Sequence, residues 1–163
     1  MNTPALAPEM RMLITHECVR LQHLYCQYAD RGDVNGFTGL FCRDGSVAVP
    51  EHAAFVGEAA IGAAMQQLIE TGVTNKHIST NNLIEPLSAA HAQGSCYLIV
   101  YASAAPADER GMRPLEHAST VGHYDDEFVL TDTGWKFKSR QLTRTFRRTD
   151  AIAPTASDIK VET

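Results

Sequence analysis

Apolar residues in the first part of the chain recur at the spacing that is typical of helices. Over residues 9–29 they return every three or four positions, which places them on one helical face. These positions are Ile14, Cys18, Leu21, Tyr25 and Tyr28. The helix is predicted to end at Gly32, because glycine readily adopts the left-handed conformation that follows many helices. Asp33 is predicted to cap a short second helix, and the same apolar spacing predicts a third helix over residues 57–71.

The rest of the chain has the pattern of β-strands. Long segments rich in β-branched and aromatic residues are separated by turn signals, and a brief strand is predicted earlier. The predicted strands are residues 46–49, 77–87, 94–103, 116–130 and 135–146. Asp132-Thr133-Gly134 predicts a hairpin turn between the last two. This order predicts an α+β fold shaped like a cone, with about three N-terminal helices packed on a curved antiparallel sheet.

Length and composition fit one globular domain. A chain of 163 residues is long enough for one core, and 44% hydrophobic with 20% charged residues is close to the average for folded proteins. Two prolines in the first eight residues and the polar composition after residue 150 set the boundaries. We therefore expect a flexible arm over residues 1–8, a domain over residues 9–150 and a polar C-terminal tail over residues 151–163.

Charge and cysteine content exclude several classes of function. A formal net charge of −5 argues against a nucleic-acid partner held by phosphate contacts. The chain has no apolar run long enough to cross a membrane and no visible signal peptide, so we expect a cytoplasmic protein. Its four cysteines have no metal-site spacing and are predicted to be reduced and buried. No metal and no cofactor is expected.

Four short phrases carry a resemblance to a known family. They are residues 25–33 (YCQYADRGD), 76–81 (KHISTN), 122–126 (GHYDD) and 134–137 (GWKF). In this order, on these predicted elements, they resemble the SnoaL-like branch of the nuclear-transport-factor-2-like (NTF2-like) superfamily. The resemblance implies the cone-shaped, cystatin-like fold of that superfamily. Scytalone dehydratase, bile-acid dehydratase and polyketide cyclases have this layout, as do the non-catalytic small β subunits of ring-hydroxylating dioxygenases.

The resemblance also implies which residues form a site. Position by position, the catalytic residues of the dehydratase-like members fall on Tyr25, Asp30 and His77. Polar positions on the later strands, which would bind substrate, fall on Tyr124 and Arg140. Each also has a purely structural interpretation, since an aspartate can end a helix and a tyrosine can pack in a core.

Two features of the middle strand complete the comparison. Tyr101 is a further candidate for the substrate-binding wall. Where scytalone dehydratase has a second histidine and bile-acid dehydratase an aspartate, this chain has Ser95-Cys96-Tyr97. Because no acid or imidazole stands there, this departure from the family pattern argues against the water-mediated mechanism of scytalone dehydratase.

An aspartate–histidine pair in an apolar pocket suits proton transfer without a cofactor. The predicted function is that of a lyase (a dehydratase or a retro-aldol C–C lyase), isomerase or cyclase that acts on an aromatic or polycyclic hydroxylated compound. The alternative is a non-catalytic subunit or ligand-binding module. We also expect a homodimer or homotrimer, because sheets of this kind usually bury their outer face, here along residues 116–130, against another copy.

Overall fold

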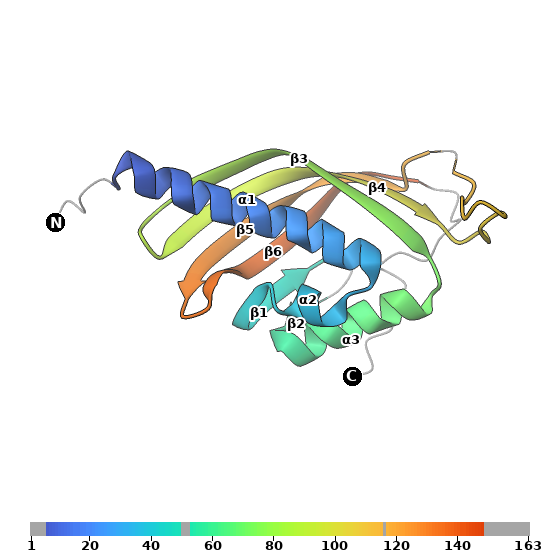
Figure 1. Ribbon diagram of the computed structural model, residues 1–163, viewed down its shortest axis with the longest axis horizontal. Coiled ribbons are helices and arrows are strands. Elements are labelled where there is room, and N and C mark those ends of the chain that lie inside the picture. Colours follow the sequence, from blue (N-terminus) through green and yellow to red (C-terminus); the bar gives the residue numbers. More distant parts are fainter. Residues whose placement is uncertain (1–5, 50–52, 116, 149–163) are drawn as a thin grey trace.

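The computed structural model describes residues 6–49, 53–115 and 117–148, in which three helices pack on one six-stranded sheet (Figure 1). The helices are α1 (Pro8–Arg31), α2 (Val34–Thr38) and α3 (Gly57–Glu70). The strands are β1 (Phe41–Ala48), β2 (Phe55–Val56), β3 (Thr74–Pro86), β4 (His91–Ser103), β5 (Thr120–Thr131) and β6 (Gly134–Arg147). The α+β class predicted from the sequence is confirmed.

The sheet is mixed, which corrects the expectation of a purely antiparallel one. Its strand order is β2-β1-β6-β5-β4-β3, and β1 runs parallel to β6 while the other neighbours are antiparallel. Parallel partners require a long connection, and here most of the chain separates the two strands. The first strand starts earlier than the predicted residues 46–49, and Asp44-Gly45 lies within β1 at an irregularity in its pairing with β6.

Figure 1 shows α1 lying along one face of the curved sheet, with α2 and α3 beside β1. A register shift between Thr80 and Leu83 interrupts β3, and Asn81 there has a positive φ of 53°. Two further shifts interrupt the pairing of β5 with β6. Such irregularities increase the bend and twist of strands, so the sheet can wrap around the helices.

The core lies between the helices and the inner face of the sheet. Ile14 and Cys18 of α1 and Ile61 of α3 are almost completely buried, as are Phe128 and Phe137 of the sheet. On β5 the burial alternates strictly from Thr120 to Phe128, as expected for a strand with one covered face.

A polar group crosses this apolar core. The side chains of Arg140, Asp126 and Gln22 are 1%, 3% and 0% exposed. Arg140 donates from Nε and Nη2 to the two oxygens of Asp126 at 2.7 Å each, and Gln22 Nε2 donates to Asp126 Oδ2 at 2.8 Å. Buried charges are tolerated when they are paired in this way.

All four cysteines are described, and none forms a disulfide. Cys18, Cys26 and Cys96 are buried, whereas Cys42 is half-buried. Burial raises the pKa of the Cys18 and Cys96 thiols to about 12. The prediction of buried, unpaired thiols is confirmed for these three.

The remaining expectations concern the ends of the chain and membranes. The helix α1 already begins at Pro8, but residues 1–5 and 151–163 lie outside the described residues, so the arm and the tail stay predictions. No helix within the described part of the chain has the length and apolar character needed to span a membrane.

Candidate active site

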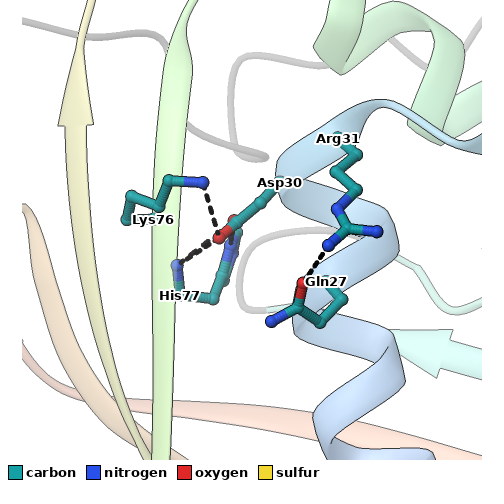
Figure 2. Close-up of polar contacts among 5 residues, drawn as sticks. All are labelled: Gln27, Asp30, Arg31, Lys76 and His77. Atoms are coloured by element: carbon teal, nitrogen blue, oxygen red, sulfur yellow. Dashed lines mark hydrogen bonds and ion pairs between the residues drawn. The ribbon is translucent and has the colours of Figure 1, made fainter. Parts of the chain in front are cut away.

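Asp30 and His77, two of the three predicted catalytic residues, form a close pair between α1 and β3 (Figure 2). The Nδ1 atom of His77 lies 2.6 Å from Oδ1 of Asp30. The backbone N–H of His77 also donates to the carboxylate, at 3.2 Å to Oδ1 and 3.1 Å to Oδ2. This double contact fixes both the ring and the strand that carries it against the end of the helix.

The local sequence explains how Asp30 reaches the sheet. It lies in the last turn of α1, and Gly32 then takes the left-handed conformation, with φ of 67°, that ends the helix. Figure 2 shows that the neighbouring Arg31 turns away and bonds Gln27 on the helix surface at 2.8 Å. Lys76 approaches Asp30 Oδ2 at 3.7 Å, but its side chain is 70% exposed. The dominant partner of the carboxylate is therefore His77.

His77 borders a cavity of about 120 Å³ between the helices and the sheet. His77, Tyr25 and Tyr124 line it, together with a mainly apolar wall from the three helices and the inner face of the sheet. That wall includes Phe37, Met65, Leu68, Leu98, Val100 and Leu142. Because Nδ1 of His77 is engaged by Asp30, the ring nitrogen that remains for a ligand is Nε2.

Asp30 stands behind His77 and faces a second space. A shallower hollow of about 220 Å³ is lined by Asp30 and by the C-terminal ends of α1 and α3. It shares Ala29, Met65, Leu68 and Asn75 with the first cavity. The two spaces are therefore adjacent, and a ligand in the cavity can extend toward the hollow.

Tyr25 and Tyr124 meet edge to face on the wall of the cavity, with their ring centroids 5.5 Å apart and their planes at 68°. Burial raises the pKa of Tyr25 to about 12, although Arg140 and a hydrogen bond from Tyr124 lower it. Burial also raises the pKa of Tyr124 well above its ordinary value. Both phenols are consequently protonated at physiological pH, and because Tyr124 donates its hydroxyl hydrogen to Tyr25, the hydrogen that remains for a ligand is that of Tyr25.

Arg140, predicted to bind substrate, does not line the cavity. It is fully buried with Asp126, and its Cζ lies 4.3 Å from the ring centroid of Tyr25 and 4.1 Å from that of Tyr124. Burial alone would lower the pKa of Arg140, but Asp126 more than offsets it, so the guanidinium is always charged. The structure thus places Arg140 behind the tyrosines, out of direct reach of a ligand.

Tyr101 is also separate from the cavity. Its neighbours Val100 and Ala102 line the cavity, and successive side chains of a strand point to opposite faces, so Tyr101 stands on the outer face of β4. The apolar run from Leu98 to Ala102 gives no sequence signal for which face is inside.

Sequence reasoning missed four polar residues that line the cavity: Asn75, Ser119, Thr120 and Arg144. Asn75 lies just before the predicted strand 77–87, and Ser119 lies close to the start of the predicted strand 116–130. The direction of a side chain is hard to infer near the end of a strand. Arg144 belongs to a cluster with Arg147 and Arg148 that resembles a solvated strand edge. Its inward direction follows from its pairing with Gly122 on β5.

A larger open groove, of about 460 Å³, lies on the outer face of the sheet. Glu85, Asp125 and Glu127 give it an acidic lining, but none of the six predicted site residues takes part. Within residues 6–49, 53–115 and 117–148, no three histidine, cysteine or acidic side chains are grouped so that they could hold a metal ion. Three of the predicted site residues, Tyr25, His77 and Tyr124, instead line the smaller cavity.

Comparisons with known proteins agree with this fold. The model of the SnoaL-like domain family matches residues 10–141, most of the described chain. Comparison with the curated protein sequences gives no match.

Solved structures share the architecture at low sequence identity. A candidate scytalone dehydratase from Novosphingobium aromaticivorans superimposes with a TM-score of 0.72 at 20% identity, covering 90% of this chain and 95% of the other. An NTF2-like protein with a cystatin-like fold, from the same organism, gives 0.67 at 23% identity, covering 89% and 90%. ActVI-ORFA from Streptomyces coelicolor gives 0.67 at 18%, covering 81% and 97%. At these identities the likeness establishes the fold.

Proposed function

This chain belongs to the SnoaL-like domain family, and from that premise we propose that its cavity is a cofactor-independent acid–base site. The reaction class is that of a lyase (a dehydratase or a retro-aldol C–C lyase), isomerase or cyclase that acts on a hydroxylated aromatic or polycyclic compound. One observation carries the proposal. His77 lines an apolar cavity with two tyrosines, while Asp30 holds its other ring nitrogen at 2.6 Å.

Asp30 and His77 have different roles in the proposed proton transfer. A carboxylate only accepts hydrogen bonds, so His77 Nδ1 carries a hydrogen and donates it to Asp30. The unprotonated Nε2 then takes a proton from a carbon next to a carbonyl group, and Asp30 stabilises the imidazolium that results. The imidazolium then delivers its Nε2 proton to the hydroxyl that leaves as water, or to another carbon of the substrate, and the ring becomes neutral again.

The tyrosines complete the site. When a proton leaves the carbon, negative charge develops on the carbonyl oxygen, and neutral donors aimed at that oxygen stabilise it. Tyr25 and Tyr124 supply two phenol groups on the same cavity wall.

The cavity volume adds a limit on substrate size. A space of about 120 Å³ holds roughly one six-membered ring, since a 150 Å³ cavity takes benzene. A polycyclic substrate would therefore place its reacting ring in the cavity and the remainder in the hollow beside Asp30.

The alternative from another class is a ligand-binding module or a non-catalytic subunit of a larger enzyme. Such a protein needs no proton carrier in its cavity. The partly buried, doubly held His77 supports the enzyme, because a ring oriented by a carboxylate and open to a cavity is the arrangement that acid–base catalysis requires.

The test is proton exchange in D₂O. We would incubate the protein with a panel of cyclic ketones and β-hydroxy ketones of one to three rings, and follow loss of the proton next to the carbonyl, and loss of water, by NMR. His77→Gln is expected to slow the reaction by about 10²–10⁴-fold, the usual contribution of a positioned acid–base group. Asp30→Asn should slow it less, because the amide keeps contact with the ring.

A matched control exists on the outer face, where His123 Nε2 lies 3.4 Å from Asp125 Oδ2. His123→Gln should leave exchange unchanged. If none of the compounds exchanges faster than in buffer, the binding module becomes the better description. Equal exchange by His77→Gln and the wild type would reject the role of His77.

A further inference from the structure

Arg140 occupies an unusual place directly behind the candidate site. Its guanidinium carbon lies between 4.1 and 4.4 Å from the ring centroids of Tyr25, Tyr124 and Phe137. Two of these rings, those of Tyr25 and Tyr124, also line the cavity. A guanidinium over an aromatic face is attracted by the negative charge of the ring face, so it also fixes the position of the ring.

The guanidinium is itself held from three elements. Asp126 of β5 accepts from its Nε and Nη2 atoms, and Gln22 of α1 donates to Asp126. Asn82, at the irregularity of β3, donates from Nδ2 to Gln22 Oε1 at 2.7 Å. The plane of Arg140 is therefore fixed relative to the helix and the sheet.

The positive member of the ion pair, the guanidinium, is the one next to the tyrosine rings. Asp126 takes two of the three guanidinium nitrogens, and the third, Nη1, is buried without a hydrogen-bond partner among the described residues. The side of the pair that faces the tyrosine rings is the positive one. Consistent with this, Arg140 lowers the pKa of Tyr25 by more than Asp126 raises it.

Stability alone gives a weak reason for such a pair. Taking two charges out of water costs several kcal/mol, and well-packed apolar residues often replace a buried ion pair without loss of stability. A cation held beside the two cavity tyrosines would, however, stabilise negative charge that develops on a ligand bound to them.

Resting on the proposed function, we infer that Arg140, held by Asp126, is a positioning residue of this site. It fixes the rings of Tyr25 and Tyr124 and, through them, favours a negatively charged oxygen, such as an enolate or phenolate, at the tyrosine end of the cavity.

The probe for this inference is 4-nitrophenol, a single-ring phenol that ionises near neutral pH and changes its visible absorption when it does. Bound at the tyrosine end, it should be more acidic than in water, because a nearby cation favours the charged form. Other charged or titratable groups also line the cavity, namely His77 from β3 and Arg144 from β6. The titrations are therefore done in the His77→Gln background as well.

Two variants, one double and one single, should move the pKa of the bound probe in opposite directions. Arg140→Gln, paired with Asp126→Asn so that no charge is left unpaired, should weaken binding of the phenolate by about tenfold, which is about one pKa unit. Asp126→Asn alone leaves the cation less neutralised, so the bound phenol should become more acidic than in the wild type. A merely structural role predicts weaker binding in both variants.

Controls separate the possible causes. Lys138→Gln removes an exposed cation of the same strand, which pairs with Asp44, and should leave the probe unaffected. Tyr25→Phe and Tyr124→Phe keep the rings beside Arg140 and should weaken phenolate binding.

Three results would overturn the inference. These are an unshifted probe in the wild type, a shift of the same sign in the single and double variants, or loss of folding in both of them. The outcome is independent of the proposed function, because the probe binds without proton transfer by His77. Opposite shifts in a protein that exchanges no substrate proton would support the role of Arg140 and reject the acid–base site.

Discussion

Two aspartates three residues apart, Asp30 and Asp33, have different roles because Gly32 lies between them. Asp30 is still on the helix and reaches across to β3, whereas Asp33 follows the turn and accepts from the backbone of Gly36 at 2.8 Å, as an N-cap of α2. The cap follows from local sequence. The partnership of Asp30 with His77 joins residues 47 positions apart, and only the resemblance to a family pointed to it.

At the residue scale, Tyr25 makes the free energy of unfolding fall with pH in the alkaline range. Its pKa is raised from 10.0 to about 12 by burial, so the folded protein keeps a proton that the unfolded chain loses. Stability is then full below pH 10 and falls as the pH rises toward 12. In Tyr25→Phe, the slope of the unfolding free energy against pH should correspond to about one fewer proton released on unfolding.

Urea unfolding at pH 9, 10 and 11 measures that slope. Tyr97, which is 59% exposed, provides the control, because Tyr97→Phe removes a hydroxyl that burial does not protect. A slope unchanged by Tyr25→Phe would contradict the prediction.

At the scale of elements, β5 and β6 approach each other so closely that one position requires glycine. A Cβ atom at Gly122 would lie 2.1 Å from the carbonyl oxygen of Thr143. Gly122 also adjoins a register shift, between cavity-lining residues Thr120 and Tyr124. Its missing side chain thus helps to shape the wall of the site.

Gly122→Ala is expected to destabilise the protein by about 1–3 kcal/mol, because the backbone of one strand must move. Gly62→Ala is the opposite case. Gly62 lies inside α3, and a Cβ atom there would make ordinary contacts of 3.4 Å and 3.7 Å with Thr38 and Val34. Alanine at position 62 should stabilise the helix by about 0.5–1 kcal/mol. Thermal unfolding compares the two, and equal effects would contradict the argument.

The elements that the sequence predicted best are those with one clear periodicity. The expected helix over residues 57–71 corresponds to α3, and the hairpin at Asp132-Thr133-Gly134 joins β5 to β6. The parallel pairing of β1 with β6 was missed, because nothing in local spacing encodes which distant strand is a neighbour. Arg140 was placed at the substrate for a related reason. Its buried partner, Asp126, is identified only by the register of two strands.

At the scale of the molecule, the outer face of the sheet carries exposed apolar side chains. Ile78, Tyr97 and Phe146 are 46%, 59% and 68% exposed. Val121 of β5 pairs with Ile99 on one side and with Phe146 on the other, so these residues form one patch across neighbouring strands. A patch of this kind fits the expected homo-oligomer.

Tyr97→Glu combined with Phe146→Glu should convert the oligomer to a monomer, because each copy would bury a charge in the shared face. Light scattering after gel filtration measures the mass. Met12→Glu introduces the same charge on α1, where Met12 is 66% exposed, and should leave the mass unchanged. A wild-type protein that is already monomeric at high concentration would contradict the expectation.

The cysteine thiols differ in burial, so the rate at which each is labelled by a thiol reagent reports how often the structure around it opens. Cys42 is partly accessible and should react with a thiol reagent first, although burial and Asp44 raise its pKa and slow it, whereas Cys18 and Cys96, with 0% exposure, react only after the structure opens around them. Cys18 lies on α1 and Cys96 on β4. The order in which these two become labelled would reveal whether the helix lifts from the sheet by itself or whether both separate in one cooperative event.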